Sequence, residues 1–111
     1  MDDNEYLRVK LPNKLKGEQF GIADQLLGGS RLMAICQDGK KRLGRIRGKM
    51  KKRLWVKIGD LLIVKPWSFD DEKADVVWRY TRTEANYLSE RGLLPDEVNI
   101  FRTARFRNAK R

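Results

Sequence analysis

Apolar and polar residues alternate along the middle of the chain in short stretches, which are separated by turn residues at intervals of about ten. Alternation with a period of two is typical of strands that bury one face. Five stretches of this kind predict the five strands of a small all-β sandwich or barrel. They are residues 18–27, 31–37, 41–47, 61–65 and 74–80.

The parity of the apolar residues predicts which side of the first strands faces the core. In the first strand one parity holds Phe20, Ile22 and Leu26, and Asp24 interrupts that set. The Asp38-Gly39 pair indicates a type I′ hairpin between the second and third strands. In the second strand we expect the inward residues to be Leu32, Ala34 and Cys36.

The third strand and the segment after it look irregular. Leu43 and Ile46 have opposite parity, so a regular strand cannot turn both side chains to the core. Gly44, which lies between them, therefore predicts a bulge or a sharp bend. Residues 48–53 are expected to form a loop or a single helical turn, and residues 54–58 a further extended piece.

An acidic loop, residues 68–73, is expected between the fourth and fifth strands. Consecutive carboxylates in such a loop are more typical of a solubilising turn than of a Mg²⁺ site. Trp78 shares the apolar parity of the fifth strand, so we expect it in the core. Trp67, which follows Pro66, is expected to pack under a loop.

After the fifth strand the apolar period changes to that of a helix. Thr81 and Glu84 have the spacing of a capping box, and Gly92 suits the C-terminal end, which predicts a helix from residue 82 or 83 to 91. A helix this short is marginal in water. We therefore expect Leu88 to dock the helix on the strands.

Five short strands with a glycine-marked bend favour the five-stranded Greek-key barrel of the OB-fold, with an SH3-like barrel as the alternative. The expected fold is all-β, with one short C-terminal α-helix and basic tails. The expected segments are an N-terminal tail (1–16), the barrel (17–80), the helix and the following segment docked on the barrel (81–99), and a basic C-terminal tail (100–111).

The net charge of +10 is unevenly distributed. Residues 40–57, called the basic stripe below, hold ten Lys or Arg and no acid, and residues 100–111 hold five more with no acid. A charge run is usually a solvated surface, but a surface that is merely soluble tends to mix signs. The segregation predicts a face for a polyanion. Single-stranded or structured RNA suits it best, with single-stranded DNA as the alternative.

The composition excludes most enzyme templates. The chain has no His, which removes imidazole-dependent nucleophiles, imidazole bases and His-containing metal sites. Its one cysteine, Cys36, lies in an apolar stretch and is expected to be a buried structural thiol in a reducing compartment. The longest apolar run, residues 32–36, is too short to span a membrane. We therefore expect a non-enzymatic cytoplasmic protein that needs no cofactor.

Residues 43–60, with the sequence LGRIRGKMKKRLWVKIGD, resemble the translation initiation factor 1A family of archaea and eukaryotes. The resemblance extends over residues 17–94 and includes Asp38-Gly39 and residues 73–76. It implies an S1-like OB-fold that binds the small ribosomal subunit at the decoding site, in the place of A-site tRNA. The short basic C-terminus departs from the acidic extension of eukaryotic members, so the archaeal form is the nearer match and a contact with a factor 5B homologue stays open.

All residues expected to contact RNA lie in the basic stripe. The resemblance implies Arg42, Arg45, Arg47, Lys49, Lys51, Lys52, Arg53 and Trp55, and the charge of the stripe adds Lys40 and Lys41. Trp55 suits stacking on an unpaired base, although its position is equally compatible with the core.

The leading interpretation is a translation initiation factor that is monomeric off the ribosome. Its expected partner is small-subunit rRNA at the decoding site, during start-site selection and initiator tRNA placement, with other initiation factors binding alongside. The alternative is a generic single-stranded RNA or DNA chaperone built on the same barrel, which would protect any accessible strand.

Overall fold

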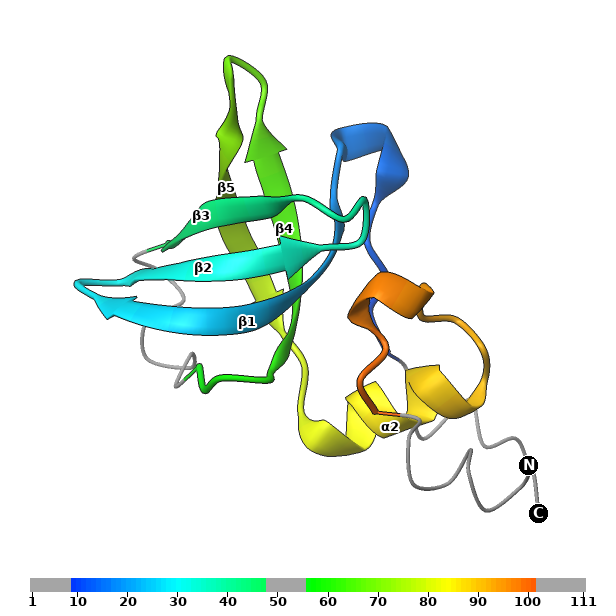
Figure 1. Cartoon of the computed structure of the whole chain (residues 1–111). Helices are drawn as coiled ribbons and strands as arrows, with labels where there is room; N and C mark the ends of the chain where they lie inside the picture. The colour runs from blue at the N-terminus through cyan, green and yellow to red at the C-terminus, as the bar shows by residue number, and fades with distance from the viewer. Residues whose placement is uncertain (1–8, 48–55, 102–111) are drawn as a thin grey trace.

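A computed structural model, which describes residues 9–47 and 56–101, shows five strands curled into a barrel with one α-helix beside it (Figure 1). The strands are β1 (Gln19–Gly28), β2 (Arg31–Cys36), β3 (Lys41–Ile46), β4 (Leu61–Trp67) and β5 (Asp70–Arg79). Helix α2 (Arg82–Glu90) and two short 3-10 helices, η1 (Lys14–Lys16) and η3 (Asp96–Val98), complete the described elements.

The strand order around the barrel is β1-β2-β3-β5-β4, and β4 pairs with β1 to close it. Four of these pairings are antiparallel, whereas β3 and β5 run parallel. This closed order is that of a five-stranded OB-fold. The predicted fold class is therefore confirmed, and the SH3-like alternative is wrong.

The barrel wall separates two apolar clusters, and β4 contributes to both. Leu62 and Val64 belong to the barrel interior, whereas Leu61 and Ile63 belong to a second cluster that β4 shares with α2. This double burial follows from the alternation of side chains along a strand. The interior cluster also holds the residues expected inward on β2, which are Leu32, Ala34 and Cys36.

Helix α2 begins and ends at the expected signals. Thr81 Oγ1 accepts the N–H of Glu84 at 3.1 Å, and the Glu84 carboxylate accepts the N–H of Thr81 at 3.0 Å, which is a capping box. Gly92 follows the helix with a φ of 73°, in the left-handed region that glycine favours. Leu88 is buried in the second cluster together with Tyr80. The helix therefore docks on the barrel through Leu88, as expected.

The single face expected for Phe20, Ile22 and Leu26 on β1 is wrong, because a bulge divides them between two faces. The pairing with β2 shifts between Ala23 and Gln25, which makes Asp24 a bulge residue. An extra residue turns every following side chain to the opposite face. Phe20 and Ile22, which precede the bulge, lie in the second cluster, whereas Leu26, which follows it, shares the face of Leu32 toward the barrel interior and is 46% exposed.

The β2–β3 hairpin is present, but its turn is not type I′. Gly39 has a φ of 88°, whereas Asp38 does not have a positive φ. The Gly39 N–H donates to the Cys36 carbonyl at 2.8 Å, and the Cys36 N–H donates to the Lys40 carbonyl at 2.9 Å. These bonds enclose a three-residue loop that ends in a left-handed glycine, a common hairpin that also favours an Asp-Gly pair.

Gly44 does not form the expected bulge, because β3 pairs with β2 and β5 without a register shift at this residue. A Cβ atom at Gly44 would lie 3.1 Å from Val76 Cγ2 and 3.3 Å from Leu32 Cδ1. The glycine therefore allows close packing inside the barrel. Arg42 and Ile46 share its face of β3, and Leu43 lies on the other face.

The acidic segment 68–73 is mostly strand, so the predicted loop is too long. β4 continues through Pro66 to Trp67, which pairs with Asp70, and only two residues form the turn between the strands. The carboxylates at the start of β5 are compatible with a strand because cations face them, as shown below. The predicted loop at 48–53 and the first two residues of the extended piece at 54–58 lie outside the described residues, and the described residues 56–58 are not part of a strand.

Candidate nucleic-acid interface

Residues 40–47 of the basic stripe lie on β3 and at its ends, where strand parity divides their cations. The side chain of Arg42 points to the inner face of the barrel and is 3% exposed. Lys41 and Arg45 point outward with side chains that are 59% and 61% exposed, and Arg47 follows the strand at 45%. The cations of the stripe therefore differ in solvent exposure, although they all carry the same charge.

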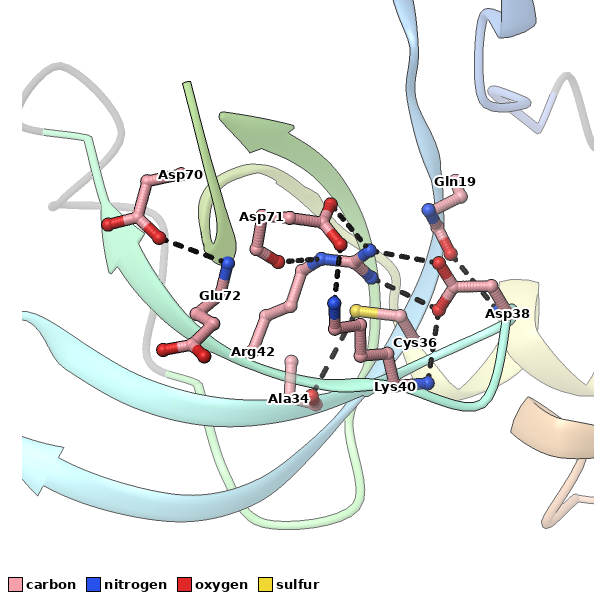
Figure 2. A network of polar contacts seen from close by, with 9 residues as sticks. All are labelled: Gln19, Ala34, Cys36, Asp38, Lys40, Arg42, Asp70, Asp71 and Glu72. Atoms are coloured by element: carbon pink, nitrogen blue, oxygen red, sulfur yellow. Dashed lines mark hydrogen bonds and ion pairs between the residues drawn. The ribbon is translucent and has the colours of Figure 1, made fainter. Parts of the chain in front are cut away.

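The Arg42 guanidinium connects the β2–β3 loop to the start of β5 (Figure 2). Its Nη1 and Nη2 donate to the two carboxylate oxygens of Asp38 at 3.1 and 2.9 Å. Nη2 also donates to Asp71 Oδ1 at 3.0 Å, and Nε donates to the Asp71 carbonyl at 2.8 Å. Bonds in this fork geometry hold the guanidinium on two carboxylates.

The electrostatics of this cluster favour the ionised pair. The hydrogen bond from Arg42 is the main reason that the pKa of Asp38 is lowered, and hydrogen bonds from Lys40 and then Arg42 lower the pKa of Asp71. Burial raises the pKa of the neighbouring Cys36 thiol, which keeps it protonated. Arg42 therefore has a structural position, in contrast to the RNA contact expected from the sequence.

The outward cations of the stripe also face carboxylates. Lys40 Nζ lies 2.5 Å from Asp71 Oδ2, and Lys41 Nζ lies 3.4 Å from Asp24 Oδ2. The separation of charge along the sequence is thus reduced in space, because β1 and β5 bring acids to β3. Exposed pairs of this kind contribute little to stability, so a phosphate can compete for the cations.

Residues 48–55 of the stripe are known from the sequence alone. The site residues predicted there lie outside the described part of the chain; they are Lys49, Lys51, Lys52, Arg53 and Trp55. The described structure resumes at Val56, and exposed Lys57 donates its backbone N–H to Asp60 Oδ2 at 2.8 Å.

Beside Arg45 lies an aromatic patch that the sequence did not predict, defined here as Arg45, Trp67, Phe69, Lys73 and Asp75. The Trp67 and Phe69 rings are 5.4 Å apart between centroids. Arg45 Cζ and Lys73 Nζ lie 5.8 and 5.5 Å from the Trp67 ring centroid. The Trp67 Nε1–H donates to Asp75 Oδ1 at 3.1 Å.

Trp67 was expected under a loop, but it lies with outward-pointing residues of β3 and β5. The Trp-Ser-Phe run at the end of this hairpin is the sequence signal for the patch. It predicts the patch only if the turn is taken to contain two residues. Trp78, expected in the core, is half-buried against the second cluster. Its buried indole N–H has no hydrogen-bond partner within the described residues.

Residues 9–47 and 56–101 contain neither a cluster of metal ligands nor a membrane-spanning helix. No group of three or more potential metal ligands was found there. None of the helices in these segments is long and apolar enough to cross a membrane.

The closed OB-fold barrel carries exposed cations and aromatic rings on one outer surface. This arrangement is typical of the class of barrels that bind nucleic acids. A family model described as "Translation initiation factor 1A / IF-1" matches residues 6–103. The chain therefore belongs to the translation initiation factor 1A family, whose members are non-enzymatic factors.

Curated relatives agree with this assignment over most of the chain. A translation initiation factor 1A of Picrophilus torridus is 51% identical over 100 residues, which cover 90% of this chain and 93% of the relative. The factor of Thermoplasma acidophilum is 56% identical over 95 residues, 86% of this chain and 80% of the relative. That of Methanothermobacter thermautotrophicus is 53% identical over 91 residues, 81% of this chain and 90% of the relative. These relatives are archaeal, as the basic C-terminus predicts.

Proposed function

We propose that this chain binds the small ribosomal subunit at the decoding (A) site during start-site selection and initiator tRNA placement. The observation that carries the proposal is the family match over residues 6–103, which contain the whole basic stripe. The barrel acts as a rigid carrier of cations, and binding comes from the neutralisation of rRNA phosphates with release of counterions.

The proposed RNA surface is the outward part of the basic stripe. It consists of Lys40, Lys41, Arg45, Arg47, Lys49, Lys51, Lys52, Arg53 and Trp55. Arg42 is left out because its guanidinium is buried on Asp38 and Asp71. The four members that belong to residues 40–47 are offset by nearby acids, so residues 48–57 supply most of the surplus charge.

The tails and partners complete the proposal. Residues 17–99 form the main part of the folded unit, to which Val9 and Phe101 add by packing against the second cluster. The rest of the basic tail, residues 102–111, lies on rRNA when the protein is bound, because it has five cations and no acid. Off the ribosome the protein is a monomer, and other initiation factors bind beside it on the subunit.

Chemical probing of small-subunit rRNA tests the proposal. The parent chain should protect nucleotides of the decoding site, and it should keep doing so in the presence of excess unrelated RNA. A stripe variant, with Lys51, Lys52 and Arg53 changed to Ala, should lose that protection. Its log-affinity against log-salt slope should flatten by about 2, from about 0.7 counterions per phosphate contact.

The matched control removes the same charge from the C-terminal tail, by changing Arg105, Arg107 and Lys110 to Ala. This tail variant should lose less affinity and keep the protected nucleotides unchanged. Equal losses from both variants, or protection of any accessible strand, would favour the generic chaperone. An unchanged salt slope in the stripe variant would contradict the proposed RNA surface.

A further inference from the structure

The tip of the β4–β5 hairpin carries an aromatic ring that the core does not use. Phe69 is 83% exposed, although it is one of the two turn residues of a hairpin that projects from the barrel (Figure 1). Turns favour Gly, Asn, Asp, Pro and Ser for reasons of backbone geometry, none of which applies to Phe. Neither folding of the turn nor burial of apolar area therefore explains this side chain.

The second ring of the patch is held in a fixed orientation. Trp67 Nε1 donates to Asp75 Oδ1 at 3.1 Å, and the plane of its ring is tilted by 32° to that of Phe69. The Asp75 carboxylate also lies 3.8 Å from Arg45 Nε. A site whose groups are already oriented loses less entropy when a ligand binds.

Two cations from different strands approach the same ring. Arg45 of β3 and Lys73 of β5 lie within 5.8 Å of the Trp67 centroid, and their side chains are 61% and 43% exposed. Cation–π contacts account for part of this arrangement. They leave Phe69 uncovered and both cationic groups partly open to solvent, so the patch presents an aromatic surface between positive charges.

We propose that Trp67 and Phe69 form a stacking site for an unpaired nucleotide of RNA. Arg45 and Lys73 contact the phosphates on either side of that nucleotide, and Asp75 is a positioning residue for Trp67. The inference rests on the proposed RNA binding and adds base stacking to phosphate contacts. RNA is favoured over an apolar peptide because Arg45 belongs to the basic stripe, and because β4–β5 loops of OB-folds bind oligonucleotides.

The test uses the full chain and a single-stranded RNA of about ten nucleotides that carries one 2-aminopurine, a length within the site sizes of single OB-folds. Phe69→Ala should weaken binding about 10-fold and reduce the quenching of 2-aminopurine, because stacking is lost. The salt slope should stay unchanged, since no charge is removed.

Two controls accompany this variant. Phe69→Tyr keeps a ring and should bind as the parent does. Leu15→Ala removes an apolar side chain that is 98% exposed on η1, outside the patch, and should leave binding unchanged. Unfolding midpoints of all variants should match, since neither Phe69 nor Leu15 contributes to the core.

The outcomes separate this inference from the proposed function. If the parent binds the RNA with a salt-dependent affinity and Phe69→Ala binds equally well, the stacking site is wrong and the RNA surface stands. If the parent does not bind RNA or small subunits, the proposed function fails. If Phe69→Ala binds RNA normally but loses affinity for the intact subunit, the patch contacts protein and its assignment to RNA is overturned.

Discussion

Arg42 and Arg45 lie on the same strand and in the same run of cations, yet their environments differ completely. The Arg42 side chain is 3% exposed and is bonded to Asp38 and Asp71, whereas the Arg45 side chain is 61% exposed with Asp75 at 3.8 Å. Strand parity makes this difference, because successive residues of β3 face the barrel interior and the outside in turn. A basic run on a strand is therefore two sets of cations with separate roles.

The two arginines should also differ in what they contribute. A buried guanidinium that fills its donors with carboxylate and carbonyl oxygens holds segments of the chain together. An exposed ion pair adds little to folding and is easily exchanged for another anion. We expect Arg42 to act on stability and Arg45 to act on binding.

The largest expected effect is on folding. Arg42→Ala should lower the free energy of unfolding by about 2–4 kcal/mol, because it removes several charged hydrogen bonds and leaves a gap between the β2–β3 loop and β5. Arg45→Ala should change it by less than about 0.5 kcal/mol. Urea unfolding of both variants measures the difference. Equal losses of stability in the two variants would mean that the hydrogen bonds of Arg42 to Asp38 and Asp71 stabilise the fold no more than the exposed contacts of Arg45 do.

Gly44→Ala probes the inner face of the same strand. The added methyl group would meet Val76 Cγ2 at 3.1 Å and Leu32 Cδ1 at 3.3 Å, and both side chains are fully buried. Overpacking of this kind should lower stability by about 1–3 kcal/mol. Thermal and urea unfolding provide the measurement. A variant as stable as the parent would show that the barrel is looser at this level than its contacts indicate.

Asp75→Asn probes the outer face. The Asp75 carboxylate lies 3.8 Å from Arg45 Nε and 3.6 Å from Arg47 Nη1, so its removal frees both cations while an amide oxygen can still accept the Trp67 N–H. RNA affinity should rise about 3-fold at low salt, with little change in stability. Filter binding at several salt concentrations measures the affinity. A weaker complex would mean that Asp75 orients the arginines more than it opposes phosphate.

The smallest expected effect is a dependence on pH. Arg42 lowers the pKa of Asp38, so the stability from the ionised carboxylate is complete above its ordinary value of 3.8 and is lost as pH falls through the lowered folded pKa. The difference in unfolding free energy between the parent and Asp38→Asn should therefore be larger at about pH 6 than at about pH 2. Urea unfolding of both proteins at the two pH values measures this difference. An equal difference at both pH values would show that the ionised Asp38 carboxylate does not stabilise the fold through Arg42.

Local patterns predicted the parts of the fold that depend on near neighbours. The parity of β2 and the Thr81–Glu84 capping box are confirmed because alternation and capping act within a few residues. The roles of Gly44 and Asp24 were missed because they depend on strand pairing. The parallel contact of β3 with β5 brings Val76 against Gly44, and no local pattern shows which strand will be the neighbour.

The candidate site divides in the same way. Charge counting found the basic stripe, but it could not show that Asp71 and Asp75, distant in sequence, would face Arg42 and Arg45. The aromatic patch was missed for a related reason. Its members come from three strands, and a turn of two residues rather than a longer loop brings Phe69 beside Trp67.

The division of labour on β3 is tested most directly by measuring both unfolding and small-subunit affinity for two sets of variants. Changing Arg45 and Arg47 together to Gln should flatten the log-affinity against log-salt slope by about 1.4 and leave the unfolding midpoint within error of the parent. Arg42→Gln should lower the unfolding midpoint and leave the salt slope of the folded protein unchanged. A flattened slope for Arg42→Gln, or an unchanged slope for the double variant, would contradict the assignment of the inner face to structure and the outer face to RNA.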